Sequence, residues 1–444
     1  MKSIFDVLKA EKLTSLKIRY DFRTDIFGFK AGREWDVSTD FSNYNKTFYS
    51  QSILTNDNIY LGTAQVNEMI NKNGAAEYFE QVKDLIRQGK HVGIDMLYND
   101  KFNIRFVCGI HSLKRGVNSK SHAMMAGATR RRGFDNTELE VIVDALNLSR
   151  AMTFKNVAAN LPFGGCKTAI HMDAPDLSNM EMMGFLAYAC DSTRCITGPD
   201  MSMPKEMVKV MNSNFTMQYC GGTGSALGDT AVPTGYGVYL ALKQAVKFKT
   251  GSESLDGMSA AIQGMGAVGY AMAQNLAKEK VKLYIANRSP ERVERFMKEH
   301  PNCDVTPVPF DEILKVNADI LCPCAIGGVL GEEEIAEIKF SYIFGGGNNQ
   351  LRATNQEEEI RLAKLLDKRG ILFQTEWWHN CAGVIAAVME YNYGYSKISA
   401  DLIKAVEEIV PTQTWKNLNQ AKELGITPTE NAYKNCQDLI YGDL

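Results

Sequence analysis

The sequence has no marked excess of either charge and no long apolar run. Its 444 residues include 49 Lys and Arg against 52 Asp and Glu, a formal net charge of −3. This balance gives no electrostatic reason to expect nucleic acid or an anionic membrane as a partner. The longest uncharged stretch, 210–228, is rich in Asn, Gly, Ser and Thr. Because a membrane helix needs about 20 predominantly apolar residues, we expect no membrane-spanning segment.

Signals for secretion and for metal binding are also missing. Asp6, Lys9 and Glu11 lie where a signal peptide has its apolar core. The ten cysteines are scattered, which favours reduced thiols and a cytoplasmic protein. The one close pair, in LCPC (321–324), is CxC and not CxxC, and HExxH is absent. We therefore expect no metal site.

What remains is an ordinary globular composition, with 45% hydrophobic residues in a chain long enough for two or three domains. Apolar residues recur at helical spacing over 137–152. From Met258 onward, short apolar runs alternate with helical stretches, a pattern that predicts a parallel sheet covered on both faces. The Gly/Pro cluster at 220–235 indicates a boundary or hinge. The predicted fold class is therefore α/β.

A glycine-rich segment, GMGAVG, follows the predicted strand ending at Gln263. Gly264 would allow a tight turn, Gly266 would let backbone amides approach a pyrophosphate, and Gly269 would let helix and strand pack closely. Ala267 and Val268 complete this candidate dinucleotide-binding turn. The alternative is a glycine turn with a purely structural use.

The end of the next predicted strand bears on the choice of dinucleotide. An acidic residue there would bind a ribose 2′-hydroxyl, but the sequence has Asn287 and Arg288. A cation and a small polar group favour a 2′-phosphate, so we expect NADP, with NAD as the alternative. Arg288 could instead be an ordinary surface residue.

Two lysines and one aspartate are candidates for chemistry. Lys155 and Lys167 lie twelve residues apart, and Lys167 follows a Gly-Gly-Cys turn. A lysine desolvated beside another cation has a lowered pKa and can act as a base near neutral pH. Asp200 follows Gly-Pro. Taken singly, these residues could equally be surface lysines and a capping or loop aspartate.

Together, however, the motifs resemble the glutamate/leucine/phenylalanine/valine dehydrogenase superfamily, closest to its leucine/phenylalanine branch. The resemblance extends from about Gly109 to about Tyr395. The motifs stand in the order of the family: AGATR (126–130), MTFKNVAANLPFGGCKTAI (152–170), GPD (198–200), PTGYGVY (233–239), GMGAVG (264–269), PCAIGG (323–328), GGGNNQL (345–351) and HNCAGVI (379–385).

The resemblance implies oxidative deamination of an L-amino acid to a 2-oxo acid and ammonia. Lys155 would bind the substrate carboxylate, Lys167 would be the catalytic lysine that activates water, and Asp200 would shuttle the proton of the amino nitrogen. Thr234 would bind the nicotinamide carboxamide. The cofactor and substrate cleft would also include Ala325, Asn348 and Asn380.

The same resemblance bears on the substrate side chain. Glutamate enzymes have a lysine where this chain has Ala126, and a serine where it has Ala387. A pocket with Ala126, Val384 and Ala387 favours an apolar or elongated side chain. Cys166, which stands where the family has a third glycine, is a departure that crowds the site.

The resemblance also implies two domains and a homo-oligomer. Residues 1–230, with a helical return at 390–444, would form the substrate-binding and oligomerisation domain, and residues 231–390 would form the Rossmann dinucleotide-binding domain. The active site would lie between them. Three alternatives stay open: a related dehydrogenase acting on a diamino acid or other amine, a hydroxy-acid dehydrogenase, and a non-catalytic dinucleotide-binding regulator.

Overall fold

The computed structural model describes residues 2–36, 38–44, 58–115, 123–215, 219–221, 225, 227–394 and 400–442. The chain divides into two compact units, each with its own β-sheet. Within the described ranges, no helix combines the length and the apolar character needed to cross a bilayer. Unit 1 comprises Met1–Asn156, Pro162–Asp229 and Ala387–Lys397, and unit 2 comprises Val157–Leu161, Thr230–Ala386 and Ile398–Leu444.

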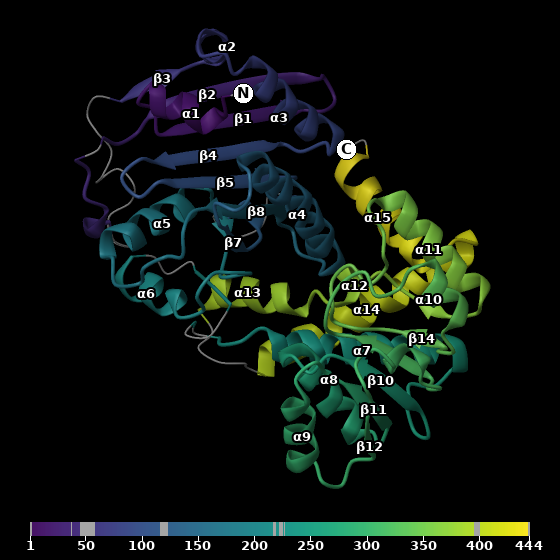
Figure 1. Cartoon of the computed structure of the whole chain (residues 1–444). Coiled ribbons are helices and arrows are strands. Elements are labelled where there is room, and N and C mark those ends of the chain that lie inside the picture. The colour runs from purple at the N-terminus through teal and green to yellow at the C-terminus, as the bar shows by residue number, and fades with distance from the viewer. Residues whose placement is uncertain are drawn as a thin grey trace. The chain divides into compact units, whose positions relative to one another are not determined.

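Unit 1 is built on a mixed sheet with the strand order β3-β2-β1-β4-β5-β8-β6-β9, and β7 pairs with β8 (Figure 1). The strands from β3 to β8 along this order are antiparallel, whereas β6, β7 and β9 add in parallel. The strands are β1 (Ser15–Asp21), β2 (Ile26–Arg33), β3 (Ile59–Leu61), β4 (Gly93–Asn99), β5 (Ile104–Ile110), β6 (Met125–Ala126), β7 (Thr129–Arg132), β8 (Gly164–His171) and β9 (Cys195–Ile196).

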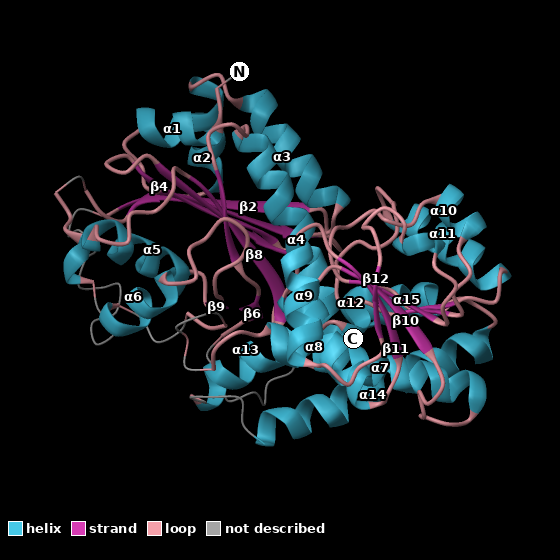
Figure 2. Cartoon of the chain, turned by 60° about the horizontal axis from the view of Figure 1, so that its bottom comes forward, coloured by secondary structure: helices cyan, strands magenta, loops and turns pink. Residues whose placement is uncertain are grey.

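Helices cover both faces of this sheet. Successive residues of a strand point to opposite faces, so Ile94 and Met96 of β4 pack with the first four helices, whereas Leu97 packs with α5 and α6. Figure 2 shows the two helix layers on opposite sides of the strands. The helices are α1 (Ile4–Ala10), α2 (Thr63–Lys72), α3 (Ala76–Gln88), α4 (Glu138–Ala158), α5 (Met180–Ser192) and α6 (Met207–Asn214), with the short η1 (Phe41–Asn43).

The sheet of unit 2 is parallel, with the order β12-β11-β10-β13-β14-β15. Numbered from β10, this is the 3-2-1-4-5-6 order of a dinucleotide-binding Rossmann sheet. The strand–helix alternation beyond Met258 is thus confirmed as a parallel sheet. Its strands are β10 (Ser259–Gln263), β11 (Lys282–Ala286), β12 (Val305–Pro307), β13 (Ile320–Pro323), β14 (Tyr342–Ile343) and β15 (Leu372–Phe373).

Helices surround this second sheet, and one of them begins earlier than the sequence indicated. The Gly/Pro cluster at 220–235 predicts a boundary or hinge, and the two units do divide within it, between Asp229 and Thr230, although Ala231–Gly235 already forms the first turn of α7. The helices are α7 (Ala231–Thr250), α8 (Ala267–Lys278), α9 (Pro290–Glu299), α10 (Glu332–Glu337), α11 (Gln356–Lys368), α12 (Glu376–His379), α14 (Ala400–Leu424) and α15 (Pro428–Tyr441), with the short η3 (Ile313–Lys315). Helix α13 (Ala382–Tyr393) is divided between the units after Ala386.

The C-terminal helices correct one prediction. We expected residues 390–444 to return to the first domain, but the described residues from 400 onward belong to unit 2. The reason is packing, because α14 lies along α7 and α15 lies against α14 and α11. A side chain added at Gly237 of α7 would come within 3.5 Å of Val410 and 3.7 Å of Val406 on α14.

The scattered cysteines predict reduced thiols only, and one pair of cysteines departs from this prediction. The structure joins Cys166 of β8 to Cys195 of β9 in a disulfide, and the other eight cysteines form no disulfide among the described residues. Strand β6 lies between β8 and β9, and Gly127 follows it. Because Gly127 has no side chain, space is left there: an added Cβ would lie 3.0 Å from the sulfur of Cys166.

Candidate active site

Lys167 and Asp200 lie together in unit 1. Lys167 is on β8, an interior strand that pairs with β5, β6 and β7, and its side chain is only 6% exposed. Its Nζ donates a hydrogen bond to Oδ2 of Asp200. The backbone N–H of Asp200 donates to the carbonyl of Thr129 on β7 at 2.8 Å, which fixes the loop after β9. The sheet therefore places the two residues in contact although 33 positions separate them.

Arg130, also on β7, completes this cluster. Its Nε and Nη2 both donate to Oδ2 of Asp200, at 3.0 and 2.9 Å, and its Nη1 donates to Oδ1 of Asp144 on α4 at 3.2 Å. Asp144 also accepts from Nε of Arg132 at 3.0 Å. Sequence reasoning included Arg130 in a family motif but gave it no role. Only the pairing of β7 with β8 brings it next to Lys167 and Asp200.

The electrostatics of the cluster lower the pKa of the lysine and keep the aspartate ionised. Burial lowers the pKa of Lys167, and the charges of Arg130 and Lys155 lower it further, whereas Asp200 raises it; the net shift is downward. For Asp200, burial alone would raise the pKa, but Lys167 and Arg130 overcome it and hold the pKa well below its usual range. The geometry thus provides a lysine able to lose its proton more easily than a lysine in water.

Lys155 is near this cluster because α4 packs directly on β8. A Cβ added at Gly165 would lie 2.1 Å from the backbone nitrogen of Thr153, so no side chain fits between helix and strand. Asn156 strengthens the contact by donating to the carbonyls of Gly164 at 2.8 Å and Ala126 at 3.3 Å. Lys155, one residue before Asn156, is half-buried and acts on the pKa of Lys167.

The predicted residues of the substrate pocket are distributed over both units. Ala126 is buried on β6, and Ala387 is half-buried on α13, and both belong to unit 1. Val384, also half-buried on α13, belongs to unit 2. Their common role in selecting the substrate side chain stays a prediction.

In unit 2, the three glycines between β10 and α8 differ in the space around them. Gly264 has a φ of +99°, and an added Cβ would lie 2.6 Å from Cβ of Ala325. A Cβ at Gly269 would lie 2.0 Å from the carbonyl oxygen of Gly264, whereas one at Gly266 would meet no atom within 4 Å. Gly264 therefore makes the tight turn, Gly266 leaves open space, and Gly269 allows the helix to pack closely on the strand. A pyrophosphate-binding turn needs these three properties. Ala267 and Val268 begin the helix that follows.

Asn287 and Arg288 follow β11 beside this turn. Oδ1 of Asn287 accepts from the N–H of Met265 at 2.9 Å, and its Nδ2 donates to the carbonyl of Ser289 at 2.8 Å. Asn287 therefore braces the glycine turn. Arg288 is exposed, and its guanidinium carbon lies 5.2 Å from the centre of the Phe310 ring. No described residue from Ala286 to Ser289 carries a carboxylate.

The remaining predicted residues also lie in unit 2. Thr234 is in the first turn of α7 and donates to the carbonyl of Thr230 at 2.8 Å. Nδ2 of Asn380, a buried residue, donates to Oδ1 of Asn348 at 2.9 Å, while its own Oδ1 has no partner among the described atoms. His379, the neighbour of Asn380, is fully buried, and its Nε2 lies 3.1 Å from the carbonyl oxygen of Gly345.

Comparison with known proteins identifies relatives over most of the chain. Residues 116–220 match the family model for the Glu/Leu/Phe/Val dehydrogenase dimerisation domain, and residues 246–328 match that for shikimate/quinate 5-dehydrogenase. The chain is 31% identical to L-tryptophan dehydrogenase of Nostoc punctiforme over 80% of its own length and 95% of the relative. It is 34% identical to phenylalanine dehydrogenase of Lysinibacillus sphaericus over 71% and 81%, respectively.

A solved structure shows the same fold. The crystal structure of the Nostoc punctiforme L-tryptophan dehydrogenase matches with a TM-score of 0.67 and 27% identity, covering 81% of this chain and 99% of that one. These three findings agree: the sequence identity extends over most of each relative, the dimerisation-domain model matches, and the fold is shared. The chain belongs to the Glu/Leu/Phe/Val dehydrogenase superfamily of amino acid dehydrogenases, which are oxidoreductases acting on CH–NH2 groups.

Proposed function

We propose that this chain catalyses the reversible, NAD(P)-dependent oxidative deamination of an L-amino acid with a large apolar side chain. The observation that carries the proposal is the buried Lys167, bonded to Asp200 and influenced by Lys155. The apolar preference is supported by Ala126, where glutamate enzymes have a lysine, and by relatives named for tryptophan, phenylalanine and leucine.

Each of the three residues has a distinct part in this chemistry. Lys155 binds the substrate carboxylate as a point charge. Lys167, in its neutral form, takes a proton from the water that attacks the imine carbon, and as an ammonium ion it polarises the oxo group in the reverse direction. Asp200 is ionised before the reaction, takes a proton from the substrate amino nitrogen and so becomes neutral, and gives this proton back in the reverse direction. Arg130 holds the Asp200 carboxylate in place through its two hydrogen bonds.

The glycine turn of unit 2 fits a dinucleotide. Open space over Gly266 admits a pyrophosphate to the N-terminus of α8. We assign Thr234, Ala325 and Asn348 to the cofactor and Asn380 to the substrate. When bound, the nicotinamide accepts the hydride that leaves the substrate Cα. The lack of a carboxylate after β11 and the exposed Arg288 support NADP over NAD.

We assign residues 1–230 to substrate binding and oligomerisation and residues 231–390 to dinucleotide binding. In unit 2, the glycine turn, Asn287 and Arg288 all fall within the second of these ranges. We also propose that the chain forms a homo-oligomer, since residues 116–220 match a dimerisation domain.

The test is a rate measurement with NADP and NAD against tryptophan, phenylalanine, leucine, glutamate and diamino acids. We expect reduced dinucleotide to form with the large apolar amino acids and NADP. Lys167→Ala should reduce turnover by about a hundredfold or more, since a general base contributes about 10²–10⁴. Lys209→Ala, at an exposed lysine on α6, is the control.

Binding of the dinucleotide to Lys167→Ala should remain, because the glycine turn is untouched. Turnover that survives in Lys167→Ala would contradict the assigned base. If wild-type protein binds the dinucleotide but oxidises none of the amino acids, the result would support a non-catalytic regulator. Activity with diamino acids alone would show that the substrate is a diamino acid and not an apolar amino acid.

A further inference from the structure

Unit 1 contains a pocket of about 400 Å³ that shares no residue with the Lys167–Asp200 cluster. Its wall comes from α1 and the turn after it, from the segment after β2, from the turn after β4 and from Glu181 of α5. Most of these segments belong to the first hundred residues, which matched no family motif in the sequence. The pocket therefore needs an explanation of its own.

One part of the wall is apolar and rigid. Leu13, Trp35 and Phe41 line the pocket and are all at least 95% buried. The Trp35 ring contacts the rings of Phe41, Phe185 and Tyr188 at centroid distances of 5.5–5.6 Å. Because aromatic contacts on several sides hold this indole, the wall offers a fixed surface to a flat or branched apolar group.

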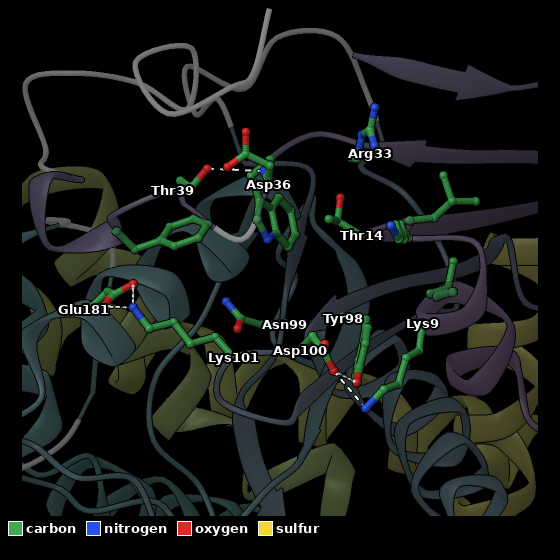
Figure 3. A pocket seen from close by; sticks show the side chains of 15 residues that line it. Lys9, Thr14, Arg33, Asp36, Thr39, Tyr98, Asn99, Asp100, Lys101 and Glu181 are labelled. Atoms are coloured by element: carbon green, nitrogen blue, oxygen red, sulfur yellow. Dashed lines mark hydrogen bonds and ion pairs between the residues drawn. The ribbon is translucent and has the colours of Figure 1, made fainter. Parts of the chain in front are cut away.

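The charges around the pocket are partly neutralised. Lys9 pairs with Asp100 at 3.0 Å and Lys101 with Glu181 at 2.6 Å, and Figure 3 shows both pairs on the side of the pocket away from Arg33 and Asp36. Among the described residues, no ion pair involves Lys12 or Arg33. Asp36 is the one further acid in the wall, and it offsets only part of this charge. The unpaired groups therefore leave a net positive charge.

Asn99 supplies an unused donor to the same pocket. The residue is only 4% exposed, and its Oδ1 accepts from the N–H of Phe102 at 3.2 Å. Its Nδ2 donates to no described residue, and Figure 3 shows the side chain between the two charged sides of the pocket. Because Asn99 lines the pocket and its Nδ2 is not enclosed by protein, this donor is available to an acceptor inside the pocket.

We propose that this pocket binds a small monocarboxylate with an apolar or aromatic body. The carboxylate accepts from Nδ2 of Asn99 and is attracted by Lys12 and Arg33, while the apolar body lies against Trp35 and Leu13. One negative charge matches the net positive charge of the wall, whereas a polyphosphate carries more negative charge than this wall offsets. An amino acid and its 2-oxo acid both have this chemistry.

The test is calorimetric titration of the full chain, without dinucleotide, using 3-phenylpropionate as the probe. To remove binding at the active site, the titration is made in the Lys155→Ala background. Asn99→Asp is the sharpest variant, because its carboxylate still accepts from Phe102 but faces the ligand with a negative charge. We expect it to weaken binding at least tenfold and Arg33→Gln to weaken it severalfold.

Lys2→Ala, at an exposed lysine outside the pocket, should bind the probe as the background does. Parallel titrations with phenylpyruvate and L-phenylalanine distinguish a 2-oxo acid from an amino acid as the ligand. Only the amino acid has an ammonium group for Asp36 to pair with, so Asp36→Asn should weaken the binding of L-phenylalanine and not that of phenylpyruvate. No binding in the Lys155→Ala background, or equal binding by Asn99→Asp, would overturn the proposal. Because these readouts need no turnover, they are independent of the proposed reaction.

Discussion

In unit 1, two basic side chains donate hydrogen bonds to the same carboxylate oxygen. Lys167 and Arg130 both donate to Oδ2 of Asp200, so this oxygen accepts from two cations at once. Arg130 is itself held by Asp144. A planar guanidinium can bind two acceptors in fixed directions, so Arg130 acts as a positioning residue for Asp200. The charge of Arg130 also opposes a proton on Lys167.

We predict that Arg130→Gln moves the pH dependence of the reaction upward. Removing this cation raises the pKa of Lys167, because one of the charges that lowered it is gone. The neutral base then forms at higher pH, and the rising limb of kcat against pH shifts in the same direction. Arg130→Lys should restore part of the original profile.

Arg132→Gln is the matched control for this shift. Arg132 donates to Asp144 but not to Asp200 or Lys167. Its loss should therefore leave the pH at which kcat rises nearly unchanged. A lower rate in Arg130→Gln with an unmoved pH profile would argue for a structural role only.

At the scale of elements, the turn between β10 and α8 allows its glycines to be tested separately. Gly264→Ala places a side chain at a φ of +99° and 2.6 Å from Ala325, and Gly269→Ala places one 2.0 Å from a backbone oxygen. We predict that each lowers the free energy of unfolding by about 1–3 kcal/mol or more and weakens dinucleotide binding. Chemical denaturation and fluorescence titration measure the two effects.

Gly266→Ala is the informative contrast in the same turn. Its φ is −66° and an added Cβ meets no atom within 4 Å, so stability should be nearly unchanged. Dinucleotide affinity should still fall, because the methyl group occupies the space through which a pyrophosphate approaches. Equal loss of stability in all three variants would contradict this division of roles.

What the sequence could predict at this scale depends on how local the signal is. The glycine turn, the helix that became α4 and the alternation beyond Met258 were recognisable because their patterns lie within a few consecutive residues. The partner of α14 was not, since the apolar stripe with Val406 and Val410 does not say which surface it will cover. Arg130 was missed for the same reason: its role depends on the pairing of β7 with β8 and on a hydrogen bond to Asp200, 70 positions away.

At the scale of the whole molecule, the two units have separate cores. The clusters that contain Phe79 and Phe185 lie within unit 1, and the cluster that contains Leu321 and Phe373 lies within unit 2. Chains with more than one core commonly depart from two-state unfolding. A ligand that binds to one unit should therefore stabilise that unit against unfolding more than it stabilises the other.

We predict that thermal unfolding followed by calorimetry shows two transitions, and that NADP raises the temperature of only one. A ligand that binds the folded state alone adds about 2.7 kcal/mol at a hundred times its Kd. This stabilisation belongs to unit 2, where the glycine turn lies. Gly266→Ala should retain both transitions and lose most of the NADP effect, because its fold is kept while its binding space is reduced. A single transition that moves as a whole with NADP would mean that the two cores unfold together.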